Sequence, residues 1–448
     1  MIFLIISLLL PFIVSLVLRF LPNALRFSCA LGVAIAVFLS NIFLSGIILK
    51  YQSMSFGKNI FNWFGISFFV DGFSIFISLL LWLTVVLFIL ALEHTKGARN
   101  EGTPDYSVVL LCAALAQAIF FSAYLSLLFL FLLAEIFLPV YFRPTSPKAI
   151  ITPIVSAGLF LTALILLYVN TATLHLEFLK SSPVNNIIAF LILAVVLLRQ
   201  WQAVLLSKKT SLSESGFKIF LTTVISIYLF VRLLCISFVS SRIFLDVTLI
   251  LAVVIIIAGA LFAFAEKSIK KILIYAVVSQ SGFLLLAFCQ PNIISFRIAL
   301  LYTFSQTLGL IGLFLGAVLI ESRTRYNNVE DYAGLLKSMP YTSIGFLLCA
   351  FSLIGIPPFL GFWPKLFTTV LSVQEGHIMI EAFASIGALL TLFYLMRLFN
   401  RMFLGENKNS PQEKKSSLLW ITFGLGVTCL ILGLFVRIPF NFIEALIR

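Results

Sequence analysis

Long apolar stretches, each about 17 to 25 residues in length, recur along the whole sequence and are separated by short polar segments. A helix of about 20 apolar residues crosses the hydrocarbon core of a bilayer, because it rises about 1.5 Å per residue. The chain of 448 residues is 61% hydrophobic and only 10% charged, and its mean hydropathy is +1.15. Soluble domains carry about 25% charged residues, so this composition is typical of an integral membrane protein.

The sequence therefore predicts an all-α, multi-pass membrane protein with about fourteen transmembrane helices. The longest polar loops, 93–105 and 404–416, are too short for a separate soluble domain. The first apolar segment lacks a basic region and a small-residue cleavage site, so we expect a retained helix and not a signal peptide. The predicted spans are 2–19, 27–49, 66–92, 106–122, 124–142, 149–169, 186–206, 217–239, 244–264, 269–289, 293–320, 341–362, 380–403 and 417–437.

Lysine and arginine are distributed unevenly between the two sides of the membrane that these spans define. If the N-terminus lies on the non-cytoplasmic side, nineteen of these cations fall in cytoplasmic loops and seven in loops of the opposite side. The other four lie inside spans. Cytoplasmic loops of membrane proteins are enriched in Lys and Arg. We therefore expect both termini on the non-cytoplasmic side of a bacterial inner membrane or an organelle inner membrane.

The composition also argues against several classes of protein. The net charge of +13 comes from cations that are scattered through short loops without a basic stripe, so we expect no nucleic-acid binding. The six cysteines lie singly in apolar runs without CxxC spacing, and the three histidines are equally dispersed. We therefore expect no metal, haem or other cofactor and no disulfide.

Several ionisable residues lie inside predicted spans, where a charge is costly and by default suggests a function. Glu135 lies among apolar residues in LLFLFLLAEIFLPVYF, and a carboxylate cannot extend far towards the interface. Arg199, in LILAVVLLRQWQ, and Lys218, in SGFKIFLTTVISIYLF, are either functional or long enough to reach the inner surface. Arg232 and Asp246 lie closer to span ends, and we interpret them as interfacial side chains.

The segment GIPPFLGFWPK, from Gly355 to Lys365, interrupts the twelfth span. Pro357 and Pro358 remove two backbone donors and clash with the preceding turn, so the helix must open there, and Gly361 lies in the same break. Backbone that is not helical persists at membrane depth only where protein buries it or where it lines a wet cavity. Transporters use such discontinuous helices to form ion sites near the midplane. Lys365, just past the break, is therefore a candidate for proton transfer.

Six segments resemble the antiporter-like subunits that respiratory complex I, Mrp-type cation/proton antiporters and membrane-bound hydrogenases share. AEKSIKKILIYAVVSQSGFLLLAF, which contains Lys270 and Lys271, resembles the tenth helix of that family. NVEDYAGLLKSMP followed by FSLIGIPPFLGFWPKLF resembles its gated twelfth helix. VDGFSIFISLLLWLTVVLFI, around Asp71, is similar to its third helix, LFLLAEIFLPVYF to its fifth and FYLMRLFNRMFLG to the thirteenth helix of complex I members.

This resemblance implies two inverted five-helix repeats, formed by spans four to eight and nine to thirteen, with spans seven and twelve broken. The implied divisions are residues 1–105 for the first three helices, 106–240 and 241–405 for the two repeats, and 406–448 for the last helix.

The resemblance also implies roles for individual residues. Glu135 corresponds to the glutamate that gates the first half-channel, and Lys365 to the lysine of the second broken helix. Lys270 and Lys271 correspond to a basic pair at the inner end of the tenth helix, which has a structural alternative, and Asp71 to a supporting acid.

The first half departs from the family pattern. The family's lysine before a Pro-Phe-His-x-Trp-Leu-Pro run is replaced here by LLRQWQAVLLSKKTSLSES, so Arg199 is the candidate replacement, and Lys218 stands where many members carry a histidine. The usual residues of the eleventh helix are replaced by Tyr302, Gln306 and Leu310, so the central polar axis is thinned.

The resemblance implies a subunit that translocates protons within a larger complex, through buried Glu and Lys residues, next to other membrane subunits. A complex I-like subunit of the N type is the first interpretation, and the D-type subunit of an Mrp antiporter, which exchanges Na⁺ for H⁺, is the second. An interpretation of another class is a structural membrane subunit whose channel is closed. Redox chemistry is expected in other chains, so the chain itself is expected to be a non-redox subunit of a translocase.

Overall fold

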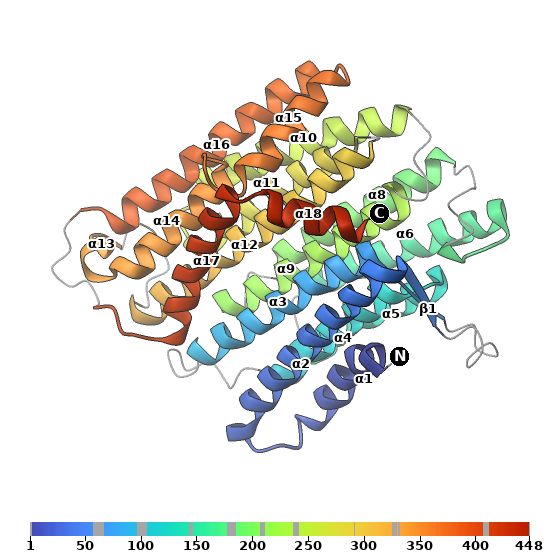
Figure 1. The fold of residues 1–448 in the computed structure, drawn as a ribbon, viewed down its shortest axis with the longest axis horizontal. Coiled ribbons are helices and arrows are strands. Elements are labelled where there is room, and N and C mark those ends of the chain that lie inside the picture. The colour runs from blue at the N-terminus through green and yellow to red at the C-terminus, as the bar shows by residue number, and fades with distance from the viewer. Residues whose placement is uncertain are drawn as a thin grey trace.

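The structure, a computed structural model, describes most of the chain as a helical bundle (Figure 1). The described residues are 2–56, 67–95, 105–142, 147–176, 185–206, 211–235, 242–290, 292–324, 329, 332–405 and 412–447.

Helices form nearly all of the regular structure within these ranges. They are α1 (Ile2–Val17), α2 (Asn23–Tyr51), α3 (Gly72–Thr95), α4 (Tyr106–Phe121), α5 (Leu125–Phe142), α6 (Pro147–Thr171), α8 (Asn186–Leu206), α9 (Leu212–Phe230), α10 (Arg242–Ala265), α11 (Ile269–Phe288), α12 (Ile293–Thr324), α13 (Leu335–Ser338), α14 (Pro340–Ile354), α15 (Phe362–Gln374), α16 (Ile378–Phe403), α17 (Ser417–Leu434) and α18 (Arg437–Leu446).

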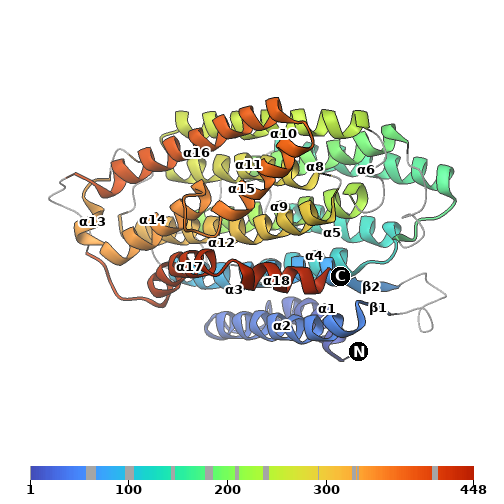
Figure 2. The same cartoon turned by 45° about the horizontal axis from the view of Figure 1, so that its top comes forward.

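The predicted all-α membrane class is confirmed. Nine helical segments of the described part are long and apolar enough to cross a bilayer, and shorter apolar helices such as α4 and α14 lie among them. Most helices run side by side, with α1 and α2 at one edge of the bundle and α10 and α16 at the opposite edge (Figures 1 and 2). α18 crosses the direction of its neighbours near the middle of the molecule (Figure 1).

Burial separates the helices of the interior from those of the periphery. In α12, 94% of the most apolar window is buried inside the protein, and the same is true of the segment Leu212–Leu233, which comprises α9 and the start of a π-helical turn, η3 (Val231–Cys235). In α16 and α17 the buried share is only 33%. Apolar side chains therefore surround the inner helices on all sides, while the outer helices present apolar faces to lipid.

One end of the bundle carries a short sheet. β1 (Ser53–Phe56) and β2 (Phe68–Asp71) pair in antiparallel register, with Ser53 opposite Asp71 and Phe56 opposite Phe68. The predicted start of the third span at residue 66 is wrong. The helix starts at Gly72 because the Asp71 carboxylate accepts a hydrogen bond of 2.9 Å from the Ser74 amide, which caps the first turn.

The twelfth span is broken, as predicted. α14 ends at Ile354 and α15 begins at Phe362, with Pro357 and Pro358 between them. The seventh span differs from its expected broken form, because α8 runs without interruption from Asn186 to Leu206. This segment contains neither proline nor glycine, so nothing in it removes a backbone donor or forces the helix to open.

α18 is an additional helix that the span prediction did not include. It packs on α2, α3 and α12, and the Arg297 guanidinium in α12 donates a hydrogen bond of 3.0 Å to the Glu444 carboxylate. A Cβ atom on Gly72 would lie 1.7 Å from the Leu446 carbonyl oxygen, so only glycine fits at the start of α3. The end of the described chain is thus fixed to the third helix.

α10 and α11 pack at very short distance through two glycines, which yields our first prediction. A Cβ atom on Gly282 would lie 2.7 Å from the Ala252 carbonyl oxygen, and one on Gly259 would lie 2.6 Å from the Ser279 nitrogen. Gly282→Ala should therefore destabilise the fold by about 1–3 kcal/mol, because the helices must separate. The measurement is the thermal unfolding midpoint of the purified protein in detergent.

Gly158→Ala on α6 is the matched control, because a Cβ atom there meets no atom within 4 Å. Equal midpoints for the two variants would contradict the close packing of α10 on α11.

Candidate functional site

The break between α14 and α15 is held by close backbone contacts. Gly355 adopts a left-handed conformation, with a φ of 87°, and terminates α14. A Cβ atom on Gly361 would lie 2.0 Å from the Ser352 carbonyl oxygen, so the returning chain lies directly against the end of α14. Both positions require glycine, which agrees with the prediction that Gly361 belongs to the break.

α17 supplies hydrogen-bond acceptors for the broken segment. The Leu360 amide donates to the Cys429 carbonyl at 3.0 Å, and the Trp363 indole donates to the Gly433 carbonyl at 2.7 Å. A Cβ atom on Gly433 would lie 2.1 Å from the Pro358 carbonyl oxygen. Because a polar backbone group without a partner is costly at membrane depth, these bonds stabilise the open segment. Nothing in the sequence of the fourteenth span indicated this role.

Lys365 extends from the first turn of α15 back to the end of α14. Its Nζ donates hydrogen bonds to the carbonyls of Leu353 at 2.7 Å and Ile354 at 3.0 Å, and lies 4.8 Å from the centroid of the Phe283 ring. These carbonyls belong to the last turn of α14, where the helix dipole favours a cation. The break therefore creates the acceptors that hold the amine inside the bundle.

A cluster of buried polar groups lies beyond Phe283. The side-chain amide nitrogen of Gln306 donates to the side-chain oxygen of Gln280 at 3.1 Å, and the centroid of the Tyr302 ring lies 6.3 Å from that of the Phe283 ring. Within the described residues, the hydroxyls of Tyr302 and Tyr394 and the side-chain amide nitrogen of Gln280 are buried without a hydrogen-bond partner. Such groups need water or another polar partner, so this region is suited to hydration. Tyr302 and Gln306 were identified from the sequence, but Tyr394, on the thirteenth span, carried no local signal.

The candidate residues of the first half lie on α5, α8 and α9. Glu135 lies in α5, and its side chain is outside the described residues. Arg199 is completely buried in α8, so its guanidinium does not extend to the membrane surface, and the interfacial interpretation is wrong. Lys218 is half-buried in α9, which packs on α8. Thr223 on α9 donates to the Gln200 side chain on α8 at 3.2 Å, which links the two helices next to Arg199.

Arg232 was also interpreted as interfacial, and this is wrong as well. It is buried, forms an ion pair with Asp71 and lies 5.3 Å above the Phe69 ring. Burial raises the pKa of the Asp71 carboxyl, but the Arg232 guanidinium and hydrogen bonds from Ser74 outweigh it, so the pKa lies below its usual value. Asp71 thus joins β2 to the end of the eighth span, and Asp246 is exposed, as an interfacial residue should be.

Lys270 and Lys271 lie in the first turn of α11, near the end of the bundle. Lys271 is exposed and pairs with Glu266 at 3.1 Å. An exposed pair of this kind contributes about 0–1 kcal/mol and cannot form a buried relay. These contacts favour the structural alternative for Lys271.

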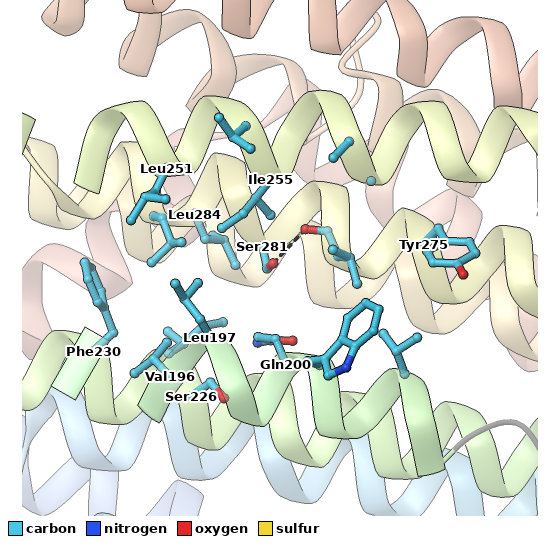
Figure 3. Close-up of a pocket in the computed structure, with 18 of the residues that line it drawn as sticks. Val196, Leu197, Gln200, Ser226, Phe230, Leu251, Ile255, Tyr275, Ser281 and Leu284 are labelled. Carbon is cyan, nitrogen blue, oxygen red and sulfur yellow. Dashed lines mark hydrogen bonds between the residues drawn. The ribbon is translucent and has the colours of Figure 1, made fainter. Parts of the chain in front are cut away.

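A cavity of about 300 Å³ lies between α8 and α9 on one side and α10 and α11 on the other. Figure 3 shows Val196 and Leu197 facing Leu251 and Leu284 across it. None of the described residues that line it is charged, and Ser281 donates back to the Val278 carbonyl at 2.7 Å. A proton moves along hydrogen-bonding groups, so this apolar space is unsuited to be its route.

A family model described as NADH:quinone oxidoreductase/Mrp antiporter, TM matches residues 113–391. Subunit N of NADH-quinone oxidoreductase from Hydrogenovibrio crunogenus is 27% identical over 187 residues, which are 41% of this chain and 39% of that protein. The same subunit from Desulforudis audaxviator is 30% identical over 195 residues, 40% of this chain and 39% of that protein. The aligned part therefore spans about two fifths of the length of these relatives.

Solved structures share the fold along the whole chain. A chain of the Mrp complex from Dietzia sp. has a TM-score of 0.85 at 19% identity, covering 100% of this chain and 97% of its own. A chain of respiratory complex I from Thermus thermophilus with bound NADH has a TM-score of 0.79 at 20% identity, covering 99% of each chain. At this level of identity the likeness establishes the fold alone.

The Asp71–Arg232 pair yields the second prediction. Asp71→Asn leaves a buried guanidinium without its counter-charge, so the fold should lose roughly 3 kcal/mol of stability near neutral pH. The sign follows from the lowered pKa: the pair stabilises the fold above the usual carboxyl pKa of about 3.9, and this contribution is lost as the pH falls through the lowered value. The measurement is thermal unfolding of the purified protein.

Asp246→Asn on α10 is the control, because its carboxylate is exposed. Adding Arg232→Met to Asp71→Asn should restore part of the stability, since the unpaired charge is then removed. An Asp71→Asn protein as stable as the control would contradict a structural role for the pair.

Proposed function

Because this chain belongs to the NADH:quinone oxidoreductase/Mrp antiporter transmembrane family, we propose that it moves protons across the membrane as an antiporter-like subunit of a multi-subunit complex. The observation that carries the proposal is a lysine amine held inside the bundle at a broken helix, beside buried polar groups. A lysine is a plausible proton carrier, because burial and nearby charges set its proton affinity. The partners would be other membrane subunits and the lipid bilayer.

The chemistry of Lys365 favours H⁺ over Na⁺ as the ion carried in the second half. An ammonium group gives up a proton and regains it, but it repels a sodium ion and offers no lone pair for coordination while charged. The carbonyls of Leu353 and Ile354 accept hydrogen bonds from the charged form and favour it. A change of charge nearby would shift this balance and so drive uptake or release of a proton.

The first half of the chain, with Glu135 on α5, Arg199 on α8 and Lys218 on α9, would act differently, as an electrostatic gate. A guanidinium keeps its proton in proteins, so Arg199 is unsuited to pass one on. It is completely buried and can serve as a fixed charge that influences Glu135 and Lys218. The second half would then carry the titrating lysine.

The named relatives favour a complex I-like assembly, because they are NADH-quinone oxidoreductase subunits. An Mrp-like Na⁺/H⁺ antiporter is the second candidate, favoured by the FWPK segment and by the fold of the Dietzia chain. The alternative of another class is a structural subunit that moves no ion. In either complex, electron transfer would occur in other chains.

Lys365 yields the third prediction. Lys365→Arg keeps the positive charge and the hydrogen-bond donors to α14 but cannot release a proton. Lys365→Met removes the charge, the donors and the proton. If the amine carries protons, both variants should lower proton movement at least about tenfold in inverted membrane vesicles of cells that assemble the complex. The measurement is a pH-sensitive dye, with NADH to drive a complex I-like assembly and Na⁺ addition for an Mrp-like one.

Lys337→Met, at an exposed position on α13, is the matched control and should behave as the wild type. Assembly is checked by the amount of the complex in the membrane. Wild-type pumping in Lys365→Arg would mean that Lys365 only caps α14. Wild-type pumping in both variants would favour the structural subunit.

Arg199 yields the fourth prediction. If it is a fixed charge, Arg199→Lys should keep or increase proton movement in the same vesicles, whereas Arg199→Ala should decrease it. A double-mutant cycle with Glu135→Gln measures whether the two residues interact. Coupling below roughly 0.5 kcal/mol would contradict the gate, because residues that act on each other depart from additivity by more than this.

A further inference from the structure

Glu381, a buried acid near the start of α16, has no part in the function proposed above. Glu381 is only 7% exposed, and its Oε1 accepts a hydrogen bond of 2.5 Å from the Thr369 hydroxyl on α15. Within the described residues its Oε2 is buried and forms no hydrogen bond, although the Ser372 side chain also lies near the carboxylate. Burying a charged carboxylate without full hydrogen bonding destabilises the fold, unless the group is protonated or reached by water. The presence of Glu381 at this position therefore needs an explanation.

Glu381 lies on the same side of α15 as Lys365. Positions 365, 369 and 372 recur at spacings of four and three residues and share one face of a helix. Thr369, the donor to Glu381, is therefore one turn from Lys365, at about 5–6 Å between Cβ atoms. α15 ends five residues further on, at Gln374, and is followed by the exposed residues Glu375 and Gly376. Glu381 thus lies between the central lysine and the end of the bundle.

Further polar groups line this short route. The Gln290 amide donates to the Ser372 hydroxyl and, at 3.4 Å, to the Thr368 carbonyl. The Thr368 hydroxyl is buried and has no hydrogen-bond partner in the part of the chain that the structure describes. Tyr302, in the buried polar cluster of α11, α12 and α16, lies within electrostatic range of Glu381. Polar groups that need additional partners indicate a hydrated path from Lys365 to Glu381.

We propose that Glu381 is the proton-carrying residue that receives protons from Lys365 and releases them at the end of the bundle formed by residues 375–377. The ammonium of Lys365 gives one proton to the Glu381 carboxylate, through the hydroxyl of Thr369 or water, which leaves a neutral amine and a neutral carboxylic acid. The acid then releases that proton to water outside and becomes a carboxylate again. The charge bias of the loops predicts that this end is the non-cytoplasmic one.

A purely structural role would give Glu381 different contacts. Acids near a helix start commonly cap its free amides. The start of α16, at His377, has no side-chain cap, and the Glu381 carboxylate turns instead towards the hydroxyl of α15. Among the described residues, no lysine or arginine forms an ion pair with Glu381. Its surroundings are those of a carboxyl that can take up and release a proton.

The proposal rests on the proposed function and is tested in the same vesicles, with the assembled complex. Glu381→Gln should lower proton movement at least about fivefold while assembly is unchanged, because an amide carries no proton. Glu381→Asp should recover much of the rate, since it retains the carboxyl. Glu375→Gln, in the adjoining exposed loop, is the matched control and should behave as the wild type.

The positioning residue Thr369 provides an independent arm if Glu381→Gln fails to assemble. Thr369→Val removes the hydroxyl with little change in volume and should lower the rate about threefold or more, and Thr369→Ser should restore it. Wild-type rates in Glu381→Gln, or in Thr369→Val where Glu381→Gln does not assemble, would overturn the inference. If Lys365→Arg is inactive in the same experiment, the proposed function stands without the Glu381 step. If Lys365→Arg is active, Lys365 is not the proton carrier and the route from Lys365 to Glu381 is overturned with it; if Lys365→Met is active as well, the proposed function itself fails.

Discussion

The need to satisfy backbone groups inside a bilayer governs the break between α14 and α15. The open segment persists because the Leu360 amide bonds to the Cys429 carbonyl of α17, and because Lys365 donates to the last carbonyls of α14. Glycines at 361 and 433 allow the backbones to approach closely enough for these bonds. Removing α17 would leave polar groups exposed to lipid, so the last spans are part of the site and not a peripheral addition.

The two halves of the protein use different means to keep charge in the membrane. In the second half, a broken helix supplies acceptors to a lysine, and buried polar side chains of α11, α12 and α16 lie beyond the Phe283 ring that the lysine contacts. In the first half, α8 is continuous and holds a completely buried arginine. Under the proposed function this arginine would set the electrostatic field, and the lysine of the second half would exchange protons. This division is the simplest account of why the family pattern is retained around Lys365 but altered around Arg199.

Much of this arrangement could be predicted from the sequence, because membrane helices need long apolar stretches and prolines interrupt them. The break at Pro357 and Pro358 and the position of Lys365 followed from these rules. The partner of Arg232 did not, because Asp71 is far away in sequence and only the fold brings the two together. Glu381 was missed for a similar reason: an acid near a span end is usually an interfacial residue, and its burial depends on how α15 folds back beside α16.

The contact of α18 with α3 has a consequence for the order in which the protein is assembled. Leu446 lies against Gly72, and Glu444 pairs with Arg297, so the start of the third helix is covered by a segment that leaves the ribosome last among the described residues. At about 5–20 residues per second, translation from Gly72 to α18 takes roughly 20–70 s. Until α18 has been synthesised, the start of α3 lacks one of its packing partners, so the native packing of α3 is completed only after α18 has formed.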